Sequence, residues 1–195
     1  MANQIDPNVL AALHKIGTSK VGQRSKYITP GSYLLELKKL EFDNKRGGLM
    51  FIAEFYVRQV TGGTDSNGNP VAPPLVGETV ANIIKFTGPA ADSAGGNVKA
   101  IVAALLGEDH NTISPEAINQ AIIGGELVDE KGNKTQVPGL RDATQPGRGL
   151  LVKCDAVGIK TKAGNEFTAL NWSSVEQSPE EVQARAAAQL AGKAA

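Results

Sequence analysis

The chain has little cysteine, histidine or tryptophan and no excess of either charge. Among 195 residues there are one cysteine (Cys154), one tryptophan (Trp172) and two histidines, and the 20 Lys and Arg equal the 20 Asp and Glu. A single cysteine excludes an internal disulfide framework and a cluster of metal-bound thiolates. Cys154 falls at an apolar position of a strand pattern, so we expect a small buried side chain there. Zero net charge argues against a polybasic, histone-like protein.

Long apolar runs are also missing. No stretch approaches the roughly 18 apolar residues of a membrane-spanning helix. The start, Met-Ala-Asn-Gln-Ile-Asp, lacks the basic and then apolar segments of a secretory signal. These absences predict a cytoplasmic protein with no membrane partner.

The motifs of the common enzyme classes are absent as well, including the phosphate loop, the dinucleotide fingerprint, the nucleophile elbow and the zinc motif H-E-x-x-H. His14 and His110 are far apart in the sequence and form no ligand pair. The run from Asp65 to Asn69 begins like a calcium loop, but Pro70 stands where such a loop needs glycine. We therefore predict no enzyme activity, no cofactor and no metal site.

What is present is a series of alternating apolar and polar residues that predicts strands. In the segment around Phe55, odd-numbered residues from Phe51 to Val57 are apolar, which places Tyr56 and Arg58 on the outer face. In the segment before it the alternation changes phase, which predicts a bulge near Lys38-Lys39. The five predicted strands are Gly31–Phe42, Leu49–Val60, Gly77–Phe86, Gly149–Ile159 and Glu166–Ser173.

Helical patterns occur between and around these strands. Asn97–Leu106 has apolar residues at helical spacing, and Ser114-Pro115 begins a second helix that runs to about Ile123. The stretch Glu126–Gly147 contains an added hairpin with its tip at Asp129–Lys134.

Two terminal segments flank this central domain of residues 28–175. Residues 1–27 contain a short helix that starts near Asp6 and a basic arm with Arg24 and Lys26, which is either a plain linker or a nucleic-acid contact. Residues 176–195 begin with the capping box Ser178-Pro179-Glu180-Glu181. The helix that follows has a thin apolar stripe, so it packs either on the central domain or on another subunit. Any homo-oligomer is expected to form through these terminal helices.

Three strands, a helix and two more strands make up the order of an OB-fold. We therefore predict a mainly β protein, a five-stranded OB-like Greek-key barrel (β-β-β-α-β-β) with extra helices and an added hairpin. Such barrels commonly bind oligonucleotides with one sheet face and two loops. The corresponding loops here, Asp43–Gly48 and Lys160–Asn165, contain two cations each and at most one anion.

The predicted binding residues combine cations that follow a phosphate backbone with aromatic rings that stack on bases. Residues 15–60 hold nine Lys or Arg against four Asp or Glu, which fits a basic groove as well as chance segregation of charge on a solvated surface. Trp172 is predicted either in the core, the position we favour from its parity with Leu170, or in the groove. The full set is Arg24, Lys26, Lys45, Arg46, Tyr56, Arg58, Lys85, Lys160, Lys162 and Trp172.

Over roughly residues 28–175 the chain resembles phage-encoded single-stranded-DNA-binding proteins built on an OB barrel. The segments that carry the resemblance are Pro30–Leu35, Phe51–Val57, Val76–Glu78, Asn97–Val102 and Thr161–Phe167 through Trp172. The resemblance implies single-stranded DNA binding without strong sequence preference, in phage replication or recombination. It also implies a place in the host cytoplasm and replication or recombination proteins as partners. Many such proteins end in an acidic tail, whereas this chain ends Ala-Gly-Lys-Ala-Ala.

A second class of function fits the same strand order. A small virion component or an inhibitor of a host complex would use the barrel as a structural or interaction scaffold, and a fold does not decide between such functions. Convergence of the loop cations, Tyr56 and Arg58 on one groove would favour nucleic-acid binding.

Overall fold

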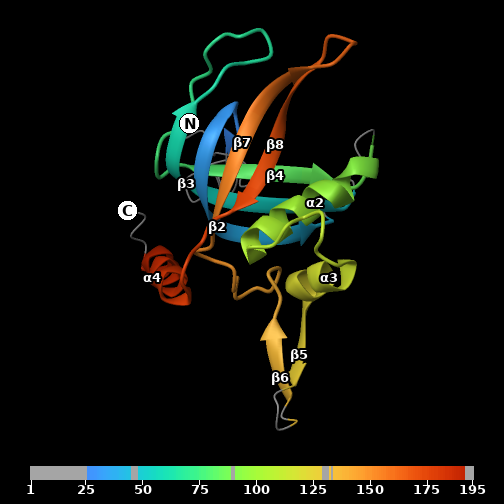
Figure 1. Cartoon of the computed structure of the whole chain (residues 1–195), viewed down its shortest axis with the longest axis vertical. Coiled ribbons are helices and arrows are strands. Elements are labelled where there is room, and N and C mark those ends of the chain that lie inside the picture. The colour runs from blue at the N-terminus through green and yellow to red at the C-terminus, as the bar shows by residue number, and fades with distance from the viewer. Residues whose placement is uncertain (1–25, 45–47, 89–90, 129–131, 133, 192–195) are drawn as a thin grey trace, which may run out of the picture.

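The computed structural model of the chain describes residues 26–44, 48–88, 91–128, 132 and 134–191. Its centre is a six-stranded sheet with the order β1-β4-β3-β2-β7-β8, and β5 and β6 form a separate two-stranded sheet. The large sheet curls, and helix α2 lies against it (Figure 1). The protein is thus mainly β with a barrel-like core, as the sequence predicts at this level.

All five predicted strands are present, with ends that move by no more than two residues. They are β2 (Gly31–Asp43), β3 (Met50–Gly62), β4 (Thr79–Lys85), β7 (Leu151–Lys160) and β8 (Glu166–Ser174). The sixth strand, β1 (Lys26–Tyr27), was not predicted and pairs in parallel with β4. A strand of two residues is too short to show a periodicity, so only its pairing with β4 identifies it.

Strand β2 is the organising strand of the sheet. It pairs along its length with β3, and its first half, Gly31 to Glu36, also pairs with β7. The register between β2 and β3 shifts between Leu37 and Lys39, which confirms the predicted bulge. Because of that extra residue, Leu37 and Leu40 are both buried, while Lys38 and Lys39 reach the outer face and pair with carboxylates there.

The concave face of the sheet and one face of α2 enclose the hydrophobic core. The alternation in β3 is as predicted, since Phe51, Phe55 and Val57 are fully buried. Helix α2 (Ala91–Leu106) contributes Val98, Ile101 and other apolar residues. It begins six residues before the predicted start at Asn97 and continues through Gly95-Gly96, which favour a loop locally. Ala94 in this added part is buried, so packing outweighs the low helix propensity of the two glycines.

The other elements extend from this core. Helix α3 (Pro115–Ile123) begins at the predicted cap, where the Ser114 hydroxyl accepts a hydrogen bond from the Ala117 amide. Strands β5 (Gly124–Val128) and β6 (Lys134–Pro138) form the predicted extra hairpin, which projects away from the sheet (Figure 1).

Helix α4 (Pro179–Leu190) starts with the predicted capping box of Ser178 and Glu181 and lies beside β2. None of its residues is buried. Polar contacts hold it instead: Gln189 donates a hydrogen bond to the Leu37 carbonyl, and the Arg185 Nε donates to the Gly149 carbonyl at 2.7 Å. Of the two packing partners considered for this helix, the structure has it on the central domain.

The predicted N-terminal helix near Asp6 lies outside the described residues, as do the arm up to residue 25 and most of the extra hairpin's tip. Within the described ranges, no helix combines the length and apolarity needed to cross a membrane.

Candidate nucleic-acid interface

Tyr56 lies at the centre of the outer face of β3, opposite the core. Its ring lies close to two cations, with Lys38 Nζ 5.4 Å and Arg58 Cζ 5.6 Å from the ring centroid. Both cations also contact carboxylates: Lys38 Nζ is 3.4 Å from Glu54 Oε2, and Arg58 Nε donates to Glu36 Oε2 at 2.7 Å. The predicted Tyr56–Arg58 pair is therefore together on one face, within a mixed set of charges.

Arg58 has a structural partner that the sequence did not reveal. Glu36 is fully buried, although its strand position faces outward, and its carboxylate accepts hydrogen bonds from Arg58 and from Gln189 of α4. The Arg58 side chain is only 18% exposed. A buried carboxylate needs such partners because burial of an unpaired charge is strongly unfavourable. The hydrogen bond to Glu36 thus occupies the Nε of Arg58.

Lys85 and Trp172 line a different hollow, of about 530 Å³, between the facing edges of β4 and β8. Trp172 is 9% exposed, and its ring stacks on Phe55 with centroids 5.4 Å apart. The tryptophan is thus in the core, the position favoured from its parity. Because β4 and β8 are far apart in the strand order yet line one hollow, the curl of the sheet brings its end strand β8 near β4.

Lys160 and Lys162 are at the far end of the β7–β8 hairpin. The pairing register places this end of the hairpin beyond Gly31, the first residue of β2. The β2–β3 loop follows Asp43, the last residue of β2, so the two loops are at opposite ends of that strand. Lys160 Nζ donates to Asn67 Oδ1 at 3.3 Å, and Glu166 accepts hydrogen bonds from Ser66 and Asn67. The hairpin end is thereby joined to the β3–β4 connection. Lys160 and Lys162 lie away from Tyr56, which pairs with Glu36, so the structure does not bring these two lysines onto one groove with it.

Of the remaining predicted residues, Lys26 is on β1, and its Nζ donates to both carboxylate oxygens of Glu78, at 2.7 and 2.8 Å. Arg24, Lys45 and Arg46 lie outside the described residues.

A loop from residue 139 to 149 continues the Tyr56 face past the end of β7. The pairing of β2 with β7 ends at Glu36 and Leu151. Beyond Glu36, this loop lies along the edge of β2 in place of β7. The Gln145 side chain accepts a hydrogen bond from the Leu40 amide at 2.7 Å and donates to the Leu40 carbonyl at 3.1 Å. Gly149 donates to the Leu37 carbonyl at 3.0 Å. The loop is thereby fixed along β2.

Between this loop and β2 there is a cleft of about 680 Å³. Among the described residues of its lining there is one carboxylate, that of Glu41, which is 2.5 Å from Lys39 Nζ. Cations outnumber it: the basic residues of the lining are Lys38, Lys39, Arg141 and Arg148. Lys38 belongs to both the cleft and the surroundings of Tyr56, so the cleft adjoins the ring. We call it the β2 cleft.

Sequence reasoning missed these basic residues. Lys38 and Lys39 had a detectable signal, because a bulge at two consecutive cations brings both to the outer face. Arg141 and Arg148 had none, since their loop has no periodicity and is about 100 positions from β2 in the sequence.

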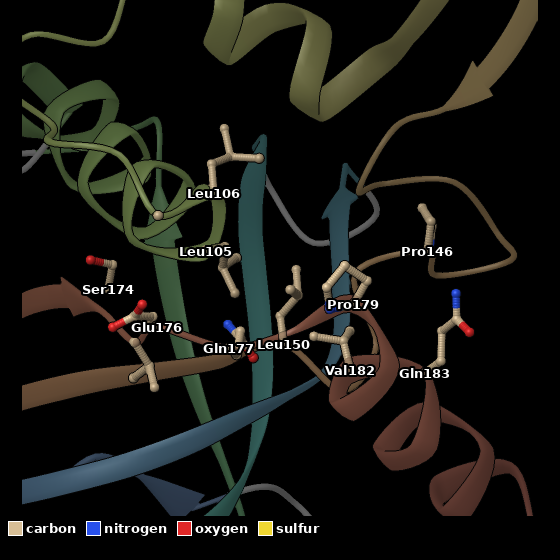
Figure 2. Close-up of a pocket in the computed structure, with 12 residues that line it drawn as sticks. Leu105, Leu106, Pro146, Leu150, Ser174, Glu176, Gln177, Pro179, Val182 and Gln183 are labelled. Carbon is tan, nitrogen blue, oxygen red and sulfur yellow. The ribbon is translucent and has the colours of Figure 1, made fainter.

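Another hollow, of about 660 Å³, separates the end of α2 from the start of α4 (Figure 2). Figure 2 shows leucine side chains from α2 and the 150 region together with Pro179 and Val182 of α4. The one charged residue among the described residues that line this hollow is Glu176. An apolar lining with a carboxylate does not suit a polyanion, so the β2 cleft is the better candidate.

Loop carboxylates are engaged locally and remain ionised. The Asn69 side chain and backbone amides lower the pKa of Asp65, and backbone and side-chain hydrogen bonds from Thr144 lower that of Asp142. Asp65 thus accepts hydrogen bonds from its own loop, the one whose sequence begins like a calcium loop. Nowhere in the described ranges do three or more His, Cys, Asp or Glu side chains gather as metal ligands would.

No protein-family model matches the chain, and no curated protein sequence is significantly similar to it. A function must therefore be argued from the geometry of the site.

Proposed function

We propose that the protein is an OB-like barrel that binds single-stranded DNA on the outer face of β2 and β3 with little sequence preference. The observation that carries this proposal is the position of Tyr56, on an outer strand face and next to a cleft in whose lining cations outnumber carboxylates. Aromatic rings stack on any base, and cations follow any phosphate backbone.

The arrangement of strands supports the barrel assignment. The long, bulged β2 pairs with the strand that follows it and with the fourth strand of the predicted barrel, while α2 lies between the third and fourth strands in the chain. A small Greek-key barrel is built in this way.

The test is binding of fluorescently labelled oligonucleotides, single- and double-stranded, DNA and RNA, measured by anisotropy over a range of salt concentrations. We expect tighter binding to the single strand, and a log–log salt slope of about 0.7 for each phosphate neutralised. Tyr56→Ala should weaken binding by about 1–3 kcal/mol if a base stacks on the ring. Tyr56→Phe keeps the ring and should bind like the parent.

Equal loss of affinity in Tyr56→Phe and Tyr56→Ala would contradict stacking. Binding to duplex alone, or no binding at low salt, would contradict the proposal as a whole and leave the scaffold function as the remaining interpretation.

A further inference from the structure

From the geometry of the β2 cleft we infer that it binds a backbone phosphate of the single strand, with Arg141 and Arg148 as its ligands. This inference rests on the proposed function and adds to it a specific phosphate subsite, formed by residues that the strand pattern does not reveal.

Arg148, which lines the cleft, has an unsatisfied side-chain N–H group. Its Nε is enclosed by protein and has no hydrogen-bond partner within the described part of the chain. An enclosed N–H group without an acceptor is unfavourable, and native structures rarely leave one without a reason. A phosphate that accepts hydrogen bonds from Nε and an adjacent Nη together would supply the missing acceptor, because arginine and phosphate form charge-assisted, often bidentate hydrogen bonds.

The charges that line the cleft are not balanced. Among the described residues of the lining, the only carboxylate is that of Glu41, and it already contacts Lys39. Asp142 is next to Arg141 in the sequence, but its Oδ1 accepts hydrogen bonds from the amide and hydroxyl of Thr144. Among the described residues, neither Arg141 nor Arg148 forms an ion pair. The cleft therefore has an excess of positive charge that an anion would neutralise.

The loop that holds both arginines is fixed by hydrogen bonds. Turns close from Asp142 to Gly139, from Gln145 to Asp142 and from Arg148 to Gln145, and the Gln145 side chain ties the loop to Leu40. A loop fixed in this way positions its cations before a ligand arrives, which lowers the entropy lost on binding.

Lys38 connects the cleft to the Tyr56 ring. It lines the cleft and also contacts the Tyr56 ring. A nucleotide whose base stacks on Tyr56 would therefore have its neighbouring phosphate at the mouth of the cleft.

The experiment measures the salt dependence of oligonucleotide binding for Arg141→Ala and Arg148→Met. Loss of one phosphate contact should lower the slope by about 0.7 in each variant and weaken binding to all sequences alike. Lys134→Ala removes the same charge from the projecting β6 strand and should leave the slope unchanged. Arg141 is exposed on a turn, so Arg141→Ala tests the cleft even if Arg148→Met does not fold.

A second measurement does not depend on nucleic acid. The Nε–Hε signal of Arg148 in the NMR spectrum, assigned by its absence in Arg148→Lys, should shift when inorganic phosphate is added. A shift with phosphate but no oligonucleotide binding by the parent would refute the proposed function and retain the anion site. Parent-like salt slopes in both arginine variants would overturn the inference while the proposed function stands, whether or not phosphate shifts the signal.

Discussion

At the scale of single residues, three glutamines complete the hydrogen bonding of strand edges. Gln145 pairs with the backbone of Leu40, Gln177 with that of Leu151, and Gln189 with the Leu37 carbonyl. An amide side chain has both a donor and an acceptor, so it can replace the peptide group of a missing neighbouring strand. Each of these three positions lies where a regular strand pair ends.

Cys154 is fully buried in β7, and burial raises the pKa of its thiol to about 12 from an ordinary value of 9.0. We expect almost no reaction with a thiol reagent at pH 8 in the native state and fast reaction in denaturant. The unfolded chain releases the thiol proton first, so stability should fall as the pH rises from about 9 to 12, by up to about 1.4 kcal/mol for each pH unit. Denaturant unfolding across that range should show a smaller decrease for Cys154→Ala. An equal decrease in both proteins would contradict the assignment.

The Glu36–Arg58 pair makes a prediction about stability. Arg58→Met leaves a buried carboxylate without its cation and should destabilise the protein by about 3–5 kcal/mol. The double change Glu36→Leu with Arg58→Met should be much less destabilising, because it removes both charges from the interior. Urea unfolding of the two variants measures the difference. If the single and double variants are equally unstable, the Glu36–Arg58 pair does not act as a unit.

At the scale of elements, the bulged second half of β2 depends on a residue outside the sheet. Gln145 has a φ of 53°, a left-handed conformation that is unfavourable for a side-chain-bearing residue. Its side chain compensates through the two hydrogen bonds to Leu40.

Substitutions of Gln145 should separate the stabilising effect of its hydrogen bonds from the destabilising effect of its backbone strain. Gln145→Ala loses the hydrogen bonds and keeps the backbone strain, whereas Gln145→Gly loses the hydrogen bonds and relieves the strain. We expect both variants to be less stable than the parent, with Gln145→Gly less affected than Gln145→Ala by about 1 kcal/mol. Thermal unfolding measures the order, and a more stable Gln145→Ala would show that strain at residue 145 is unimportant.

At the scale of the whole molecule, the curled sheet, α2 and α3 contribute to one hydrophobic core, and the β5–β6 hairpin projects away from the sheet (Figure 1). Every described side chain of β6 is exposed. The backbones of Gly124 and Gly139 approach each other closely at the base of the hairpin, so close that a Cβ on Gly139 would be 2.2 Å from the Gly124 nitrogen.

Removal of residues 125–138 and direct joining of the two glycines should therefore leave the core intact. We expect the melting temperature to change by only a few degrees and single-strand binding to remain, since the proposed interface is on β2 and β3. Circular dichroism and the anisotropy titration check the two expectations. Loss of folding would show that the hairpin belongs to the cooperative unit.

Local signals in the sequence determined much of the fold. Alternation from Phe51 to Val57, the phase change at Lys38-Lys39 and the capping residues Ser114 and Ser178 each predicted an element that the structure contains. Such features depend on neighbours within a few residues, through the two-residue period of strands and the hydrogen bonds of a helix's first turn.

Only the tertiary structure decided the surroundings of the candidate site. The buried carboxylate that holds Arg58, the loop that brings Arg141 and Arg148 beside β2, and the stacking of Trp172 on Phe55 all join residues far apart in the sequence. Their meeting depends on strand order, register and curl, which set the distance between side chains but leave no period in the sequence. The sequence by itself thus identified the strand face that carries Tyr56, and the fold determined which charges surround it.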